Sequence, residues 1–356
     1  AYNGLTTTQI DANGHQKQTV NDAFGRTQTV REYTGTTPTY TLYATTAYEY
    51  DALGGLKKVT DELGNQTTIS YDMLGRKTSM TDPDMGTWDY TYDAAGNLAT
   101  QKDNRSPRVT TTLASDALNR LTSKSYSGSS DPAVTFTYDA YPDTALCSLG
   151  ANTAKGRQTS MIDGAGEQRS CFDTRGRPVK SRRWVDGTPY DTASTYDMAN
   201  RVLDLTYPND SEVVHHTYDA ATGALTGICQ WVSNACVSGS TYLSGATYTA
   251  AGMPDLLPLG NGMSTNYDYD ATHPSRVRSI VTSGVPGTKQ NLALTYDKAG
   301  NVKTVTDNVA TETATYSYDE LDRLPGGTGF AGGQTAAYAY DKIGNMTRKK
   351  EGQLDL

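Results

Sequence analysis

The sequence predicts an all-β protein made of tandem hairpins, and three observations carry that prediction. The 356 residues include 25 Tyr, 34 Gly and 54 Thr, with 31 Asp against only 8 Glu. Thr and Tyr favour strands, whereas Gly and Asp favour turns. The dipeptide Tyr-Asp occurs twelve times, where random placement would give roughly two. Helix formers such as Glu, Leu and Lys are scarce, so the composition argues against a helical protein and against Rossmann and TIM-barrel enzymes.

The Tyr-Asp dipeptide belongs to a longer motif that predicts a strand, a turn and a returning strand. In the clearest copies Gly follows Asp by three residues, and we assign these residues a structural role as repeat turns. They are Tyr71, Asp72 and Gly75; Tyr92, Asp93 and Gly96; Tyr296, Asp297 and Gly300; and Tyr340, Asp341 and Gly344. The Asp carboxylate is expected to accept hydrogen bonds from backbone N–H groups one or two residues further on. Gly is then expected to adopt left-handed geometry and close the hairpin with a bulge.

The exceptions to this motif indicate what it requires. Where Gly is absent, the position holds Asn119, Asn200 or Asp322. Asn and Asp are the other residues that best tolerate a left-handed backbone. We therefore interpret the left-handed turn itself as the constraint. One degenerate copy, at Asp139, has Pro142 where the turn should close.

The spacing predicts one continuous array over residues 1–356, clearest over 11–349, in repeats of about 21 residues. Each repeat supplies two strands of roughly 6–8 residues and two turns, a meander step. Tyr side chains from successive hairpins are expected to stack into ladders on one face of the sheet. We interpret the array as a segment of a longer chain.

The motif Tyr-Asp-x-x-Gly-[Arg/Asn], repeated as in Tyr71–Arg76 and Tyr296–Asn301, resembles the rearrangement hotspot (RHS) or YD-repeat family. The resemblance covers nearly the whole chain. Members of that family include bacterial RHS toxins, the C component of insecticidal toxin complexes and the teneurins. The resemblance implies a long antiparallel sheet that spirals into a hollow shell around a cargo polypeptide. For a chain of this length it implies a partial shell.

Candidate catalytic and ligand-binding patterns are weak, so we expect no catalytic, cofactor-binding or metal-binding residues. The segment Gly327–Gly332 spells GxGxxG, but a strand pattern follows it where a dinucleotide site needs a helix. His215 and His216 are adjacent, and neighbours on a strand point to opposite faces. The many Asp residues occur one per turn, whereas calcium loops need several oxygen ligands together.

The net charge, the apolar runs and the cysteines limit which partners and locations the sequence predicts. The net charge is −8 and no run of Lys and Arg stands out, which argues against nucleic acid as a partner. No apolar run of 18 residues exists, so we expect no membrane span. Cys229 and Cys236 could close a local disulfide loop, or remain free buried thiols.

These observations favour a non-enzymatic β-shell that encapsulates or presents a secreted toxin or effector. Its expected partner is an enclosed polypeptide or flanking parts of the same chain. The expected location is secreted, extracellular or at the cell surface, in a bacterium. The alternative is an extracellular adhesion or filament scaffold, in which Tyr together with Trp88, Trp184 or Trp231 contacts glycans or a cell surface.

Overall fold

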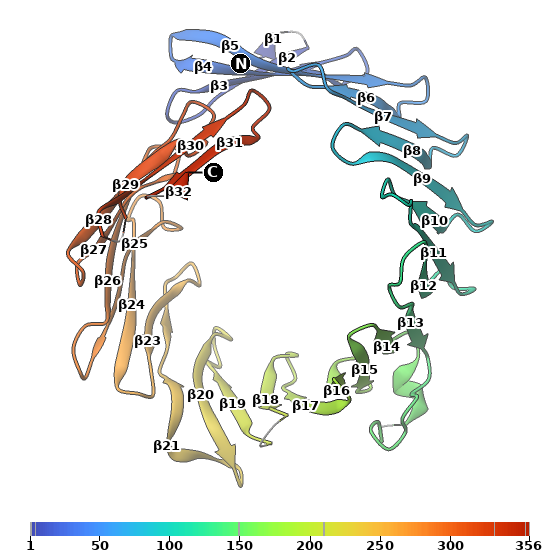
Figure 1. Ribbon diagram of the computed structural model, residues 1–356. Helices are drawn as coiled ribbons and strands as arrows, with labels where there is room; N and C mark the ends of the chain where they lie inside the picture. Colours follow the sequence, from blue (N-terminus) through green and yellow to red (C-terminus); the bar gives the residue numbers. More distant parts are fainter. Residues whose placement is uncertain are drawn as a thin grey trace. The chain divides into compact units, whose positions relative to one another are not determined.

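The structure is a computed structural model that describes residues 2–3, 5–148, 150–208, 211–330, 332–352 and 354–355. Strands dominate these ranges, and the one helical element within them is the 3-10 helix η1, Ala151–Ala154 (Figure 1). No helix in the described ranges has the length and apolar character to cross a membrane. The chain forms two compact units: unit 1 comprises Ala1–Met85 and Met263–Leu356, and unit 2 comprises Gly86–Gly262.

Unit 1 contains two runs of strands from the two ends of the chain. The first run is β1 (Tyr2–Asn3), β2 (Thr6–Ile10), β3 (Gln16–Asn21), β4 (Thr27–Thr36), β5 (Thr39–Tyr50), β6 (Leu56–Thr60), β7 (Gln66–Tyr71) and β8 (Lys77–Asp82). The second run is β24 (Met263–Tyr269), β25 (Val277–Gly284), β26 (Gln290–Tyr296), β27 (Val302–Asp307), β28 (Glu312–Ser317), β29 (Gly326–Phe330), β30 (Gln334–Tyr340), β31 (Met346–Glu351) and β32 (Leu354–Asp355). Figure 1 shows the blue and the red run side by side.

Unit 2 contains the intervening strands. They are β9 (Gly86–Tyr92), β10 (Leu98–Lys102), β11 (Thr110–Ser115), β12 (Leu121–Ser127), β13 (Val134–Tyr138), β14 (Gln158–Asp163), β15 (Gly166–Phe172), β16 (Pro178–Val185), β17 (Thr188–Tyr196), β18 (Val202–Thr206), β19 (Val213–Tyr218), β20 (Leu225–Val232), β21 (Ala235–Ser244), β22 (Thr247–Tyr248) and β23 (Pro254–Pro258).

Within each run the strands pair with their sequence neighbours in antiparallel fashion, as a meander requires. β7 pairs with β8 from Thr68 opposite Thr81 to Tyr71 opposite Lys77, and the register shifts between Ser70 and Tyr71. The same shift precedes Tyr296 and Tyr340 in the β26–β27 and β30–β31 pairs. Such a shift is a β-bulge, which adds one residue on one strand and increases the local twist. The prediction of an all-β fold of tandem antiparallel hairpins is confirmed.

The sheet is a thin layer in which few side chains are fully buried. In β7 half-buried and exposed residues alternate along the strand, with Thr67, Ile69 and Tyr71 on the half-buried side. Among the larger side chains of the described residues, only Thr159 and Cys171 lose almost all contact with solvent. Because neighbouring hairpins contribute most contacts, the stability of such an array is approximately a sum of nearest-neighbour terms.

A small core occurs in unit 2, where the hairpin after Tyr138 carries an insertion. Asp139 donates its N–H to the carbonyl of Arg157 at 3.2 Å, so the residues between them replace the short turn of the other repeats. Cys147 of the insertion forms a disulfide with Cys171 of β15, and both pack with Leu146 in a buried cluster. This disulfide attaches the insertion to the sheet, and our sequence interpretation did not include it.

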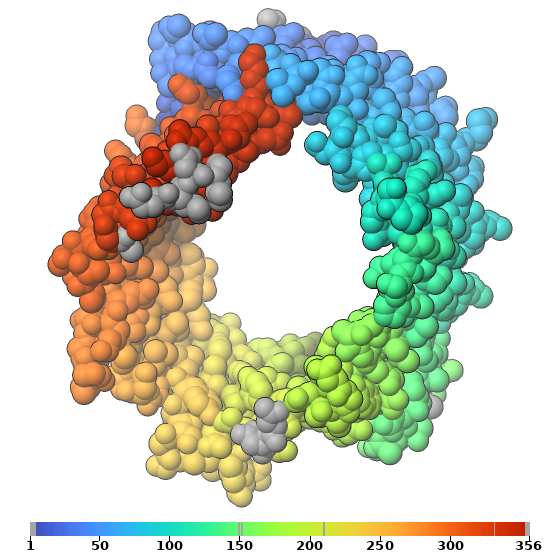
Figure 2. Space-filling view, in the orientation of Figure 1, coloured from blue at the N-terminus to red at the C-terminus, as the bar shows by residue number. Residues whose placement is uncertain are grey.

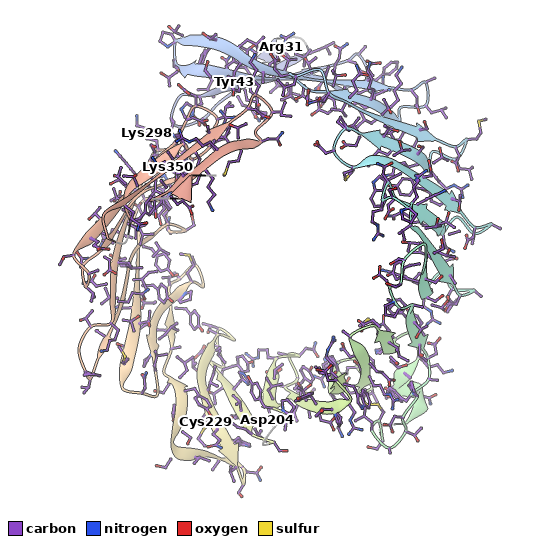
Figure 3. The ribbon with its side chains drawn as sticks, viewed as in Figure 1. Arg31, Tyr43, Asp204, Cys229, Lys298 and Lys350 are labelled. Carbon is purple, nitrogen blue, oxygen red and sulfur yellow. A yellow bond between two sulfur atoms is a disulfide. The ribbon has the colours of Figure 1, made fainter. Side chains whose placement is uncertain are left out.

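The second disulfide joins Cys229 of β20 to Cys236 of β21, so of the two alternatives for this pair the structure contains the closed loop. Cys229 lies two strands from Asp204 of β18, and both are labelled in Figure 3. Disulfides of this kind persist in oxidising compartments.

We predict that replacing Cys147 and Cys171 together by Ser lowers the local stability of β14–β15 by about 3 kcal/mol, because the disulfide closes a loop with a sequence separation of 24. Amide hydrogen exchange in these strands measures the effect, because a repeat array need not unfold in one step. The paired Cys229→Ser and Cys236→Ser change is the matched control, and it should leave β14–β15 unaffected. Equal exchange rates in β14–β15 with and without the first disulfide would contradict the prediction.

Candidate functional site

The repeat turns share one hydrogen-bond pattern, which the turn after β7 illustrates. Asp72 donates its N–H to the carbonyl of Arg76 at 2.9 Å, and Gly75 donates its N–H to the carbonyl of Asp72 at 3.0 Å. The Asp72 Oδ1 accepts the backbone N–H groups of Leu74 and Arg76, both at 2.9 Å. Gly75 has a φ of 76°, in the left-handed region that favours glycine.

The other assigned turns repeat this arrangement. Asp93, Asp297 and Asp341 each donate their N–H to the carbonyl four residues on, and each accepts the N–H of that residue at Oδ1. The φ angles of Gly96, Gly300 and Gly344 are 89°, 105° and 91°. The structure thus places the four sets of assigned residues in equivalent hairpin turns.

The substitutes for glycine also adopt left-handed geometry, with φ of 61° at Asn119, 66° at Asn200 and 58° at Asp322. The expected reach of the Asp carboxylate was wrong in one respect. It accepts the N–H two residues further on, as expected, but its second backbone donor lies four residues further on and not one, as at Asp72 and Asp116. The bulge brings the fourth N–H back toward the carboxylate, because the returning strand begins there.

The second carboxylate oxygen binds a side chain at the position four residues after Asp. Where that residue is Arg, its Nε donates to Oδ2, as in Arg26, Arg76, Arg120, Arg177, Arg201 and Arg323. Where it is Asn, the Nδ2 group donates, as in Asn65, Asn97, Asn301 and Asn345. Side-chain contacts between Asp and Arg or Asn therefore stabilise the turn in addition to its backbone hydrogen bonds.

The Arg of one turn also contacts the Tyr of the next hairpin. The Arg177 guanidinium lies 4.8 Å from the centroid of the Tyr196 ring and donates from Nη1 to the carbonyl of Asp197 at 2.9 Å. The Tyr196 hydroxyl in turn donates to the carbonyl of Pro178 at 2.6 Å. A partly exposed cation–π contact is worth about 0.5–1 kcal/mol, so Arg177 couples two hairpins as well as closing its own turn.

These contacts between hairpins recur throughout both units. Arg lies over the next Tyr in the pairs Arg26–Tyr50, Arg120–Tyr138, Arg201–Tyr218, Arg276–Tyr296 and Arg323–Tyr340. Tyr hydroxyls donate to preceding carbonyls in the pairs Tyr50–Thr27, Tyr71–Leu56, Tyr138–Leu121, Tyr218–Val202, Tyr248–Leu225, Tyr296–Val277, Tyr318–Val302 and Tyr340–Leu324.

This geometry corrects the expectation that Tyr side chains of successive hairpins stack into ladders. Among the described residues, the close aromatic pairs are Tyr33–Tyr40, His215–Trp231 and Tyr316–Phe330, and none joins two YD tyrosines. Several YD rings instead face the guanidinium of the Arg in the preceding turn, namely Tyr50, Tyr138, Tyr196, Tyr218 and Tyr340. Successive tyrosines are a full hairpin apart, which is farther than the direct cross-strand neighbours that stack.

The electrostatics of the turns favour ionised carboxylates. The backbone N–H of Arg76 lowers the pKa of Asp72, and the Asn97 amide lowers the pKa of Asp93. At the insertion, the Arg120 guanidinium and then the Gly156 N–H lower the pKa of Asp139 to about 2. Each of these carboxylates is engaged with turn donors, so the turn acids have a structural role.

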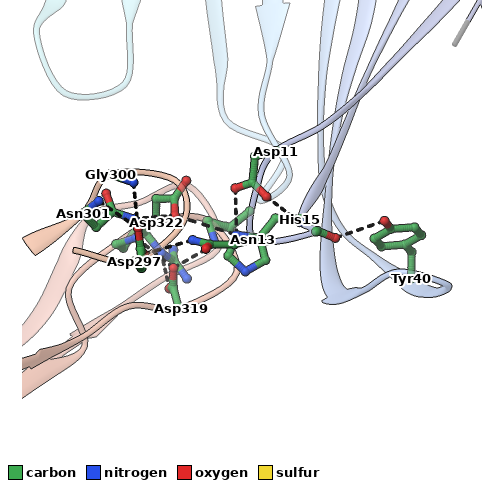
Figure 4. Close-up of polar contacts among 12 residues, drawn as sticks. Asp11, Asn13, His15, Tyr40, Asp297, Gly300, Asn301, Asp319 and Asp322 are labelled. Atoms are coloured by element: carbon green, nitrogen blue, oxygen red, sulfur yellow. Dashed lines mark hydrogen bonds and ion pairs between the residues drawn. The ribbon is translucent and has the colours of Figure 1, made fainter. Parts of the chain in front are cut away.

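In unit 1 the turns of the second run contact two turns and strand β5 of the first run, and we call this line of contacts the seam. Asn13 donates from Nδ2 to Asp297 Oδ2 at 2.9 Å (Figure 4). The Tyr43 hydroxyl donates to the carbonyl of Asp341 at 3.3 Å, and Lys342 pairs with Glu62 at 2.9 Å. Figure 3 labels Tyr43 on the blue sheet, and Figure 2 shows the blue and red surfaces in contact.

At one end of the seam His15 contacts carboxylates from both runs. Its Nδ1 lies 3.1 Å from Asp11 Oδ2 and 3.7 Å from Asp322 Oδ1 (Figure 4). Our sequence interpretation assigned no role to Asn13, His15, Tyr43 or Glu62, because it gave roles only to the Tyr, Asp and left-handed positions of the turns. The available signal was His15 itself, which stands where other turns carry Arg or Asn.

The remaining candidate patterns have ordinary structural partners. His215 Nδ1 contacts Asp204 at 2.6 Å and its ring stacks on Trp231, while His216 Nδ1 lies near the carbonyl of Leu203. Residues Gly327–Phe330 of the GxGxxG segment lie in β29, which pairs with β28 and β30. Residue 331 of that segment lies outside the described residues.

Comparison with known proteins identifies the repeat. Residues 50–84 and 296–329 match the family model of the RHS repeat. The crystal structure of TcdB2-TccC3 is similar over 100% of this chain and 21% of that chain, with a TM-score of 0.83 and 19% identity. The TcdB2-TccC3-Cdc42 structure gives a TM-score of 0.81 at 19% identity, with coverage of 100% and 21%. A Tc holotoxin pore from Photorhabdus luminescens gives 0.80 at 19% identity, with coverage of 99% and 20%.

The chain thus spans about a fifth of the length of the solved chains that it matches. No curated protein matches the chain significantly. The predicted RHS/YD resemblance is confirmed, and so is the prediction of a fold of the RHS-shell type.

We predict that Gly75→Ala destabilises the β7–β8 hairpin by about 1–2 kcal/mol, because a Cβ is unfavourable in left-handed geometry. Apart from Gly75 and its two chain neighbours, no heavy atom of the described residues lies within 4 Å of the position that the new Cβ would take, so the effect isolates the backbone. Gly75→Asn is the control, because Asn119 and Asn200 occupy this position in sister turns. Hydrogen exchange in β7–β8 gives the local stability. The idea fails if Ala and Asn behave alike.

We also predict that acid weakens both units between about pH 4 and pH 2. A carboxyl whose pKa is lower in the folded state contributes stability above its unfolded pKa of about 4, and this contribution disappears as the pH falls through the folded pKa. For Asp139 that folded pKa is about 2. Thermal unfolding midpoints between about pH 5 and pH 2 measure the loss, and Asp139→Asn should flatten the profile. A pH-independent midpoint over this range would contradict the assignment.

Proposed function

This chain carries RHS repeats, and from that premise we propose that it forms part of the wall of a β-shell. The shell encloses or presents a secreted toxin or effector polypeptide. The observation that carries this proposal is the similarity of the chain, over its whole length, to about a fifth of the chain in TcdB2-TccC3 crystal structures.

The physical properties of the sheet support a wall. In β7 and β28 half-buried and exposed residues alternate, so neither face is covered by a second layer of secondary structure. Tyr rings, Arg side chains and turn carboxylates hold neighbouring hairpins together in place of a deep core. A sheet of this kind can present one whole face to an enclosed chain while the other face meets solvent.

The contacts of the seam are a second argument for the same proposal. It joins turns of the second run to two turns and strand β5 of the first run through Asn13, Glu62 and Tyr43. Contacts of this kind between runs from opposite ends of the chain are what a wound wall requires.

We propose that the chain has no enzymatic activity. The turn acids accept backbone N–H groups and the side chains of the returning strand, as at Asp72 and Asp297. His215 is held by Asp204 and Trp231. Groups engaged in this way are poorly placed to act as general acids or bases. Enclosure and presentation need geometry and stability, which this network supplies.

We propose a secreted or extracellular location, in a bacterium. The two disulfides support an oxidising environment, and the Tc holotoxin structure that the chain resembles comes from Photorhabdus luminescens. The partner is then either an enclosed polypeptide or another part of the same protein.

We predict that the native full-length parent of this chain protects a polypeptide from protease, and that unfolding the parent removes the protection. Mass spectrometry of the fragments after digestion measures it. Tyr43→Ala, which removes a seam contact, should speed the cleavage of the protected polypeptide several-fold. Tyr33→Ala is the matched control, because the Tyr33 hydroxyl binds Gln18 within the first run.

Two outcomes would overturn the proposal. The first is that every polypeptide of the native parent is cleaved as fast as in the unfolded state. The second is that the purified protein protects nothing but binds glycans or cell surfaces through its exposed side chains. That second result favours the alternative, an extracellular adhesion or filament scaffold.

A further inference from the structure

A pocket at the seam of unit 1 gathers charged side chains from both runs of strands. It has a volume of about 300 Å³ and is lined by residues of β2–β4 and of the turn that follows Tyr318. Its carboxylates are those of Asp11, Glu32, Glu320 and Asp322, and its one ammonium group is that of Lys17. Lys17 pairs with Glu32 at 3.3 Å, so negative charge remains in excess on the other side of the pocket.

His15 stands at the centre of that negative side. Its side chain is 16% exposed, and ligand atoms of Asp11, His15 and Asp322 lie within 4.8 Å of one another. The His15 Nδ1 is 3.1 Å from Asp11 Oδ2 and 3.7 Å from Asp322 Oδ1. A tetrahedral zinc ion with bonds of 2.0–2.1 Å has ligand–ligand edges of about 3.3–3.4 Å. The two measured separations lie on either side of that value.

Two departures from the repeat meet at this point. The residue four positions after the turn Asp is Arg or Asn in most of the equivalent turns, with Gly55 in the turn of Asp51. The N–H groups of Arg and Asn side chains can only donate to the carboxylate. His15 can fill the same role and can also bind a metal through a ring nitrogen. At the left-handed position the sister turns carry Gly, Asn119 or Asn200, whereas Asp322 adds a carboxylate.

The remaining contacts leave lone pairs free for a cation. Asp11 Oδ1 accepts the N–H of His15, and its Oδ2 faces the ring. Asp322 Oδ1 accepts the Asn301 amide at 2.9 Å, and a carboxylate oxygen has a second lone pair. Arg323, the nearest guanidinium along the chain, is engaged by Asp319 Oδ2 at 2.7 Å. Among the described residues, His15 is the ion-pair partner recorded for Asp11 and Asp322, and no Lys or Arg pairs with either carboxylate.

We propose that Asp11, His15 and Asp322 bind a zinc-type divalent cation that clamps the two runs of unit 1 together. An imidazole ligand favours zinc over magnesium and calcium, which prefer oxygen ligands alone. Three protein ligands leave the fourth position to water. The neutral imidazole binds the cation through Nδ1 and carries its single proton on Nε2, so protons compete with the cation for the ring and the affinity falls with decreasing pH. This proposal is independent of the shell function.

The array provides its own matched variants for the test. His15→Asn places the residue of four sister turns at this position, and Asn65 shows that its amide still reaches the turn carboxylate. Asp322→Asn keeps a residue that tolerates left-handed geometry, as Asn119 and Asn200 do. Both changes remove a ligand while they keep the turn. His273→Asn is the control, because His273 lies in a different turn of unit 1 beside Asp270.

Calorimetric titration of the full chain with zinc chloride tests the proposal, with thermal unfolding and circular dichroism on the same samples. We expect one zinc ion per chain with micromolar affinity, and a higher unfolding midpoint when zinc is present. His15→Asn and Asp322→Asn should each weaken binding at least tenfold and remove the midpoint shift, with unchanged circular dichroism. His273→Asn should bind as the parent does.

Cobalt(II) provides a second readout, because tetrahedral coordination by His15 and the two carboxylates gives intense visible absorption bands. The proposal is overturned if zinc does not bind, if the His15→Asn and Asp322→Asn variants bind as tightly as the parent, or if His273→Asn abolishes binding. It is also overturned if calcium binds more tightly than zinc, because that result would make the imidazole irrelevant.

Discussion

The structure depends on one short-range interaction, the capture of turn N–H groups by the carboxylate of the Asp that ends each YD strand. At Asp72 the carboxylate holds two backbone donors and the Arg76 side chain at once. The shorter Asp side chain can reach its own turn, whereas Glu places its carboxylate too far out. Without this contact the bulged turn has no fixed register, and the hairpin partners on both sides lose their alignment.

The same interaction extends from one hairpin to the next. The Arg that satisfies Asp173 also lies over Tyr196, and the hydroxyl of that Tyr returns to the backbone beside the same Arg. A guanidinium can do this because its planar surface covers a ring while its N–H groups bind oxygen. Each hairpin is therefore stabilised mainly by contacts with its immediate neighbours in the sheet. It needs no central core, and the main buried cluster lies where the insertion is held by Cys147 and Cys171.

At the seam, residues that close their own hairpin turns also bind the other run of strands. Turn residues that close a hairpin in the second run, such as Asp297 and Asp341, also accept donors from the first run. A repeat whose turns are already satisfied internally needs only small changes, such as His15 in place of Arg or Asn, to form new contacts where two runs meet.

The sequence by itself determined the hairpins. Twelve Tyr-Asp dipeptides, the Gly three residues later and the substitutes Asn119, Asn200 and Asp322 identified the strands, the turns and the left-handed positions, because these features depend on residues within a few positions of one another. The RHS/YD fold followed from the same pattern. The Arg–Tyr contacts were within reach of the sequence too, since their partners recur one repeat apart, but the pattern suggested Tyr stacking instead.

Only the tertiary structure decided which residues far apart in the chain come together. Asn13 with Asp297, Tyr43 with Asp341, and His15 with Asp322 are separated by nearly the whole sequence. The Cys147–Cys171 disulfide likewise depends on how an insertion folds back on β15. Periodicity carries no information on such pairs, because every repeat has the same local pattern. The positions of these pairs follow from the twist that accumulates over many hairpins. The sequence of a single repeat does not specify that sum.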